Sequence, residues 1–175
     1  TIALNKPRGY ICSRSSKQGR TIFDLPNPIP DTLVPAGRLD KNSEGLLILS
    51  NDGDLVNRLT HPSYGHNKTY RVTVSGEQQE EAIQRIRDVT ELKGKKIAPV
   101  KVEYVKTGHK PGRIALQFVL SEGRNRQIRE MCSLAGLRVH RLIRTHIGSL
   151  SLKQMNLRPG QWLSLSREQI EQNLK

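Results

Sequence analysis

The sequence predicts an α+β domain, because segments with the two-residue period of half-buried strands alternate with segments that carry the apolar stripe of surface helices. The strand patterns cover residues 68–76, 100–104 and 114–120. The helical patterns cover residues 77–89 and 125–135. A loop at 108–112 joins the last two strand patterns, so we expect these strands to pair antiparallel. With 175 residues, the chain can form one compact domain or two small lobes that share a core.

The N-terminal part of the chain is predicted to hold two strands and a short helix. The first strand pattern begins at residue 2 and ends at a Lys-Pro pair, because proline removes a ladder donor. Residues 21–35 are rich in proline and form a surface loop. The unbroken apolar run 46–49 predicts a buried strand, and Asp52 or Asp54 caps the helix that follows it.

The C-terminal part is predicted to return to the sheet. Residues 138–145 interleave basic and apolar side chains and predict a strand, which a short strand through 150–152 follows. Residues 162–165 close the sheet. Ser166 and Gln169 have the spacing of a capping box and start a terminal helix.

The charge of the chain indicates a polyanionic partner. Lysine and arginine together number 29 against 16 aspartates and glutamates, which gives a formal net charge of +13. The basic residues are scattered through patterned segments, so the charge is expected to cover a folded surface, and nucleic acid is the first candidate partner. A membrane surface is a weaker candidate, since no stretch approaches the roughly 18 apolar residues that span a bilayer.

Cysteine usage predicts neither a disulfide framework nor a metal site. Cys12 and Cys132 are far apart in the sequence, and the five histidines are irregularly spaced. We expect both cysteines to be small buried hydrophobic residues. No signal peptide pattern is present, so a cytoplasmic location is expected, and the start at Thr1 within a strand-like run indicates that an upstream segment is missing.

A single carboxylate, Asp40, stands in a polar turn between two glycines, Gly37 and Gly45, directly before the buried strand. A turn fixed by a rigid strand is a suitable place for a reactive side chain. The simpler alternative is that Asp40 caps the turn or pairs with Arg38.

The strand over 68–76 places Tyr70 on its apolar side, where it is either a core tyrosine or part of a site. The helix over 125–135 is expected to bury a stripe that consists of Ile128, Met131, Leu134 and Ala135. Three arginines lie outside this stripe: Arg124, Arg126 and Arg129. They form either a binding surface or a solvated face in which Arg126 pairs with Glu130.

Three separated stretches resemble the motifs of the RsuA-like family of ribosomal RNA pseudouridine synthases. They are Gly-Arg-Leu-Asp-Lys-Asn-Ser-Glu-Gly-Leu-Leu at 37–47, Lys-Thr-Tyr at 68–70 and Gly-Arg-Asn-Arg-Gln-Ile-Arg at 123–129. Asn-Lys-Pro-Arg-Gly-Tyr at 5–10 resembles a further motif, in which the Lys-Pro turn supports the catalytic loop. The likeness continues through Leu-Ile-Arg-Thr-His-Ile-Gly at 142–148 and Pro-Gly-Gln-Trp at 159–162, so it covers essentially the whole chain.

The resemblance implies that residues 1–175 are the catalytic domain of an RNA pseudouridine synthase, with a mixed, largely antiparallel sheet flanked by helices and an RNA-binding cleft across the sheet. It implies isomerisation of uridine to pseudouridine in ribosomal RNA, without a metal or an organic cofactor. Asn-Arg-Gln-Ile-Arg at 125–129 resembles members that act on large-subunit RNA. The small N-terminal RNA-binding domain common in the family has no counterpart in these residues, and a monomer is expected.

By the same resemblance, Asp40 is the essential catalytic aspartate and Arg129 its basic partner. Tyr70 is the tyrosine that packs against the flipped uracil, and Leu142 lines the base pocket. The candidates for RNA backbone contacts are Arg38, Lys68, Arg124 and Arg126. The main alternative is a non-catalytic basic RNA- or ribosome-binding module. A DNA-binding domain is disfavoured, because the helix at 125–135 lacks a preceding helix-turn pair.

Overall fold

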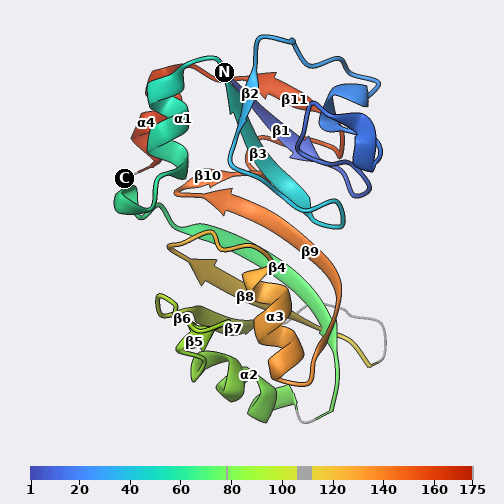
Figure 1. The fold of residues 1–175 in the computed structure, drawn as a ribbon, viewed down its shortest axis with the longest axis vertical. Helices are drawn as coiled ribbons and strands as arrows, with labels where there is room; N and C mark the ends of the chain where they lie inside the picture. Colours follow the sequence, from blue (N-terminus) through green and yellow to red (C-terminus); the bar gives the residue numbers. More distant parts are fainter. Residues whose placement is uncertain (78, 106–111, 175) are drawn as a thin grey trace.

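A computed structural model of the chain describes residues 1–77, 79–105 and 112–174. One mixed sheet dominates the described structure, with the strand order β11-β1-β3-β9-β4-β8-β7 (Figure 1). These strands are β1 (Ile2–Lys6), β3 (Glu44–Ser50), β4 (Lys68–Ser75), β7 (Lys101–Val105), β8 (Ile114–Leu120), β9 (Arg138–Ile147) and β11 (Trp162–Ser164). Two short strands complete the sheet: β2 (Val34–Ala36) pairs with β3, and β10 (Leu150–Ser151) pairs with β9. The predicted α+β class is confirmed.

The sheet has two halves, which meet at a short parallel joint between β3 and β9. One half consists of β11, β1, β3 and β2, and the other of β9, β4, β8, β7 and β10. All strand pairings of the sheet are antiparallel except β3 with β9, whose partners are Glu44 with Ile143 and Gly45 with Arg144. Gly45 has φ +107°, and a Cβ there would lie 2.8 Å from the Arg144 backbone nitrogen and collide with the Arg144 carbonyl. Only glycine therefore allows the two halves to approach this closely.

Two short helices cover one half of the sheet, α1 (Gly53–Thr60) and α4 (Arg167–Asn173) (Figure 1). Of the two predicted caps for α1, the structure uses Asp52, whose side chain accepts a 3.0 Å hydrogen bond from the Leu55 N–H. The capping box predicted for α4 is formed, with Ser166 as its N-cap. Leu55 of α1 and Ile170 of α4 share one core cluster with the sheet.

The other half carries α2 (Gln79–Arg87) and α3 (Gln127–Leu134), together with the two-stranded sheet of β5 (Glu91–Leu92) and β6 (Lys95–Lys96) (Figure 1). Helix α2 is shorter than the predicted 77–89, because its C-terminal end tightens into a turn in which the Val89 N–H bonds the Ile86 carbonyl. Residues 93–94 form the turn of the hairpin between β5 and β6.

The buried stripe of α3 differs from the prediction at one position. Ile128, Met131 and Ala135 are buried as predicted, but Leu134 is 64% exposed, and Cys132 is fully buried instead. The reason is geometric: at 3.6 residues per turn, Cys132 lies one turn after Ile128, whereas Leu134 faces about a third of a turn away.

The predicted antiparallel pairing of the strands on either side of the 108–112 loop is confirmed as β7 with β8. Most of that loop, residues 106–111, lies outside the described residues. Among the described helices, none has the length and apolar character needed to cross a bilayer.

Candidate active site

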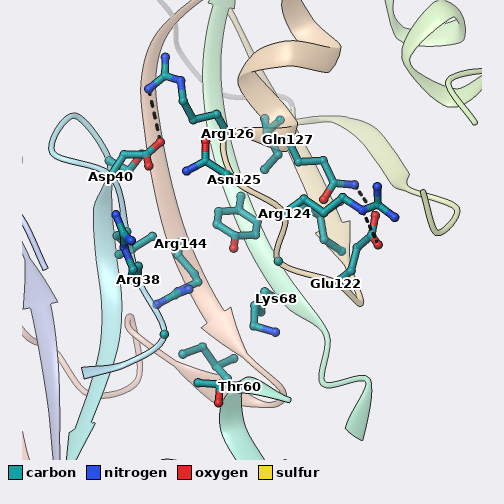
Figure 2. A pocket seen from close by; sticks show the side chains of 18 of the residues that line it. Arg38, Asp40, Thr60, Lys68, Glu122, Arg124, Asn125, Arg126, Gln127 and Arg144 are labelled. Atoms are coloured by element: carbon teal, nitrogen blue, oxygen red, sulfur yellow. Dashed lines mark hydrogen bonds and ion pairs between the residues drawn. The ribbon is translucent and has the colours of Figure 1, made fainter. Parts of the chain in front are cut away.

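A cleft of about 650 Å³ crosses the sheet where the two halves meet, over β4 and β9 (Figure 2). One wall is the loop that enters β3, and the opposite wall is the segment that joins β8 to α3. Residues 59–62, which comprise the C-terminus of α1 and the two residues after it, close the cleft on one side. The cleft thus collects segments from both halves of the sheet, and the predicted motifs at 37–47, 68–70 and 123–129 all contribute to its lining.

Asp40 stands in the turn between β2 and β3, closed by a 3.0 Å hydrogen bond from the Ser43 N–H to the Asp40 carbonyl. Its carboxylate is 29% exposed and lies 3.5 Å from Nη1 of Arg126 and 4.0 Å from Nε of Arg129. Within the described residues its ion pairs are with these two arginines and not with Arg38. The carboxylate is therefore oriented from across the cleft and remains accessible.

Lys6 fixes the Asp40 turn from beneath. Its side chain is fully buried, and its Nζ donates hydrogen bonds to the carbonyls of Pro7 (3.1 Å), Asp40 (3.1 Å) and Ser43 (2.8 Å). Burial lowers the pKa of Lys6 to about 8. The Lys-Pro turn was predicted to support the catalytic loop, but Lys6 itself was not singled out. A charged residue at the end of a strand that begins with the apolar run Ile-Ala-Leu was the available signal.

Arg129 holds the same turn from the side of α3. Its Nη2 donates to the Asn42 carbonyl at 2.9 Å and to Ser43 Oγ at 3.3 Å. Burial, followed by the nearby Arg126 charge, lowers the pKa of Arg129, and Asp40 opposes this shift. The guanidinium thus joins α3 to the Asp40 turn and places a positive charge beside the carboxylate.

Arg126 occupies the N-cap of α3 in a left-handed conformation, with φ +54°. A non-glycine residue in this region costs about 1–3 kcal/mol, and such strain is concentrated at functional sites. The alternative pairing of Arg126 with Glu130 is wrong: Arg126 faces Asp40, and Glu130 pairs with Lys93 at 3.2 Å.

Tyr70 and Leu142 supply an apolar floor for the cleft. They come from the neighbouring strands β4 and β9, where Val72 faces Leu142 and Tyr70 faces Arg144 in the register. Both Tyr70 and Leu142 are largely buried among core residues and line the cleft. The predicted inward direction of Tyr70 is confirmed. A flat ring and an aliphatic side chain form a surface suited to a planar heterocycle.

Arg124 also lines the cleft, but its donors are used within the protein. Its Nε bonds Glu122 Oε2 at 3.1 Å, and its two terminal nitrogens bond the carbonyls of Lys95 and Lys96. Glu122 in turn accepts a 2.8 Å hydrogen bond from Gln127. Arg124 therefore braces the segment before α3 against the β5–β6 hairpin.

The cleft carries an excess of positive charge. Two carboxylates line it, Asp40 and Glu122. The lining cations among the described residues are Arg38, Lys68, Arg124, Arg126, Arg129 and Arg144. Arg144 was not among the predicted site residues, and neither were His61 and His66, which also line the cleft. Across the described part of the chain, no group of three histidine, cysteine or acidic side chains is arranged to hold a metal ion.

Comparison with known proteins agrees with this geometry. The family model for RNA pseudouridylate synthases matches residues 1–134. A crystal structure of a pseudouridylate synthase superimposes with a TM-score of 0.81 at 30% identity, covering 99% of this chain and 73% of the other.

Two curated relatives are similar along most of the chain. A ribosomal large subunit pseudouridine synthase B of Bacillus subtilis is 36% identical over 154 residues, which are 87% of this chain and 63% of the relative. A putative chloroplastic ribosomal large subunit pseudouridine synthase of Arabidopsis thaliana is 34% identical over an alignment of 182 positions, which covers 97% of this chain. The chain spans only 44% of that relative's length. With its motifs gathered in one cleft and these matches along its length, the chain belongs to the RNA pseudouridylate synthase family.

Proposed function

We propose that this chain isomerises uridine to pseudouridine in ribosomal RNA, with residues 1–175 as its catalytic domain. The observation that carries the proposal is the accessible Asp40 carboxylate, held between Arg126 and Arg129 at the edge of a basic cleft with an apolar floor. The names of the relatives support large-subunit RNA as the substrate. We also propose that the protein acts as a monomer in the cytoplasm.

Asp40 is the nucleophile of the proposed reaction. Its carboxylate forms a bond to the uridine base or to its ribose, and the bond between N1 and the ribose breaks. The base then reattaches to the ribose through C5, and the bond to Asp40 breaks, which frees the carboxylate. The C5 proton leaves and N1 gains a proton, so that the product is an isomer of the substrate. Arg126 and Arg129 lie beside the carboxylate and aim it, and the Lys6 hydrogen bonds hold the turn in place.

The floor formed by Tyr70 and Leu142 receives the flipped base. Removing a uridine from its stack costs a few kcal/mol, which packing against Tyr70 and contacts to the RNA backbone offset. Arg38, Lys68 and Arg126 make such contacts, and Arg124 adds charge at the wall of the cleft while it braces that wall. Because Tyr70 is largely buried, we assign it stacking as its first role.

The test is base-resolved pseudouridine mapping of ribosomal RNA in cells that lack the gene and are complemented with wild type, Asp40→Asn or the control Asp54→Asn. Asp54 is an exposed carboxylate on α1 outside the cleft. We expect one site to disappear on deletion and to return with wild type and with Asp54→Asn, but not with Asp40→Asn.

The Asp40→Asn protein should stay folded and bind RNA, because the lost ion pairs are partly exposed and contribute about 1 kcal/mol or less. Restoration of the site by Asp40→Asn would contradict the assignment of the nucleophile. Persistence of every ribosomal site in the deleted strain would contradict the substrate and favour the non-catalytic RNA-binding module.

A further inference from the structure

Two cations of the cleft, the half-buried Lys68 and the buried Arg144, are not used by the contacts around Asp40. Lys68 begins β4, and Arg144 lies on the neighbouring strand β9, across from Tyr70. Figure 2 shows Arg144 between Arg38 and Lys68, toward the end of the cleft at Thr60 and away from Arg126. Among the described residues, neither Lys68 nor Arg144 forms an ion pair.

Arg144 is only 3% exposed, although a buried guanidinium normally requires a counter-charge. Its Nε donates to the Leu46 carbonyl at 2.7 Å, which fixes the plane of the guanidinium. Its Nη2 is buried and has no hydrogen-bond partner within the described structure. The side chain is thus held rigidly while part of its donor capacity is unused.

Lys68 is in a similar position. Its Nζ bonds the carbonyl of His66 at 3.3 Å, which satisfies one of three donors. Burial lowers the pKa of Lys68, and the nearby Arg144 charge lowers it further. The two cations therefore repel each other in a partly desolvated place. This arrangement destabilises the fold unless a bound anion compensates the two charges.

The carboxylates of the surroundings are already engaged. Asp40 faces Arg126 and Arg129, and Glu122 binds Arg124 and Gln127. Glu44, beside the joint of the sheet, binds Arg141 through both oxygens, at 2.8 and 2.9 Å. The charge of Lys68 and Arg144 is consequently uncompensated by the protein groups near them.

We propose that Lys68 and Arg144 together bind one phosphodiester of the RNA, next to the uridine that packs on Tyr70. This inference rests on the proposed function, because it takes RNA as the occupant of the cleft. Lysine and a guanidinium supply donors only, so they match an anion rather than the neutral uracil, which presents both donors and acceptors. Phosphate contacts fix the register of a nucleic acid, and the pair would set which nucleotide reaches Asp40.

The experiment measures binding of the full chain to fluorescein-labelled pentauridylate by anisotropy, at several salt concentrations. Four further probes each replace one phosphodiester by a neutral methylphosphonate. The variants are Lys68→Met, Arg144→Gln and the double variant that combines them. The control is Lys101→Met, which removes an exposed lysine of β7 that pairs with Glu103 outside the cleft.

We expect Lys68→Met and Arg144→Gln each to weaken binding about tenfold, as for a lost hydrogen bond to a charged group. The double variant should reduce the slope of log K against log salt by about 0.7, the value for one phosphate of a single strand. One methylphosphonate position should weaken the binding of wild type and of Lys101→Met, weaken that of each single variant less, and leave that of the double variant unchanged. This coupling identifies the phosphate that the pair holds.

Lys68→Met should also unfold at the same temperature as wild type or higher, because it removes a desolvated and repelled charge. A decrease of more than about 4 °C would mean that Lys68 has a structural role and would overturn the proposal. The proposal also fails if every methylphosphonate position affects Lys68→Met as much as wild type. If the variants and one methylphosphonate position are coupled but the chain modifies no ribosomal uridine, the proposed function alone is refuted. If the chain modifies its ribosomal site but this coupling is absent, the phosphate site alone is refuted.

Discussion

Replacing Gly45 by alanine would place a methyl group inside the joint between β3 and β9. The added Cβ lies 2.8 Å from the Arg144 backbone nitrogen and overlaps the Arg144 carbonyl. These neighbours are backbone atoms of a paired strand, so they cannot rotate away as a side chain would. The strands must separate, and the two pairings that join the halves, Glu44 with Ile143 and Gly45 with Arg144, are strained or lost.

Two terms set the size of the effect. Alanine at φ +107° costs about 1–3 kcal/mol in backbone strain. Overpacking adds about 1–3 kcal/mol, so the total is about 2–6 kcal/mol. Gly9→Ala is the matched control, because Gly9 has φ +94° and nothing within 4 Å of its added Cβ. Gly9→Ala therefore includes the backbone strain without the overpacking.

The assay is equilibrium unfolding in urea of wild type, Gly45→Ala and Gly9→Ala. We expect Gly45→Ala to lose about 1–3 kcal/mol more than Gly9→Ala, since overpacking is the term in which they differ. Because Asp40 precedes β3 and Leu142 lies on β9, a wider joint should also reduce turnover. Equal losses of stability in the two variants would refute the reasoning that the joint requires close backbone contact.

Three further results are expected. Lys6 has a pKa of about 8 in the folded chain against 10.5 for the free side chain, so between these values the unfolded state binds the extra proton. The urea stability of wild type relative to Lys6→Met should therefore rise with pH across that window, and a flat difference would contradict the burial of a charged amine. Asp52→Ala should lower the unfolding temperature by removing the cap of α1, whereas Asp52→Asn, which keeps an acceptor, should lower it less; equal thermal shifts would argue against the cap. Burial raises the pKa of the Cys132 thiol to about 12, so Ellman's reagent at about pH 8 should modify Cys132 only after unfolding, and fast reaction in the native protein would show that α3 opens.

Local patterns were sufficient for most elements of the fold. The alternation in β4, β7 and β8 and the capping box of α4 depend on residues a few positions apart, so they can be read from the chain directly. The exposed Leu134 shows the limit of this reasoning. Its spacing placed it at the margin of the stripe, about a third of a turn from Ile128, and the elements that α3 packs against left this margin exposed.

The sequence by itself determined the fold class and the family, and it marked Asp40, Tyr70 and Arg129 as candidate site residues, because these lie in contiguous motifs whose residue types reflect their chemistry. Only the tertiary structure decided the partners of those residues. Arg126 faces Asp40 rather than Glu130, and Lys6 reaches the same turn from 34 positions away. Such contacts depend on how the two halves of the sheet meet, and a one-dimensional pattern carries no direct record of distances between remote segments. The uncompensated charges of the cleft became visible for the same reason, once the fold showed which carboxylates were already paired.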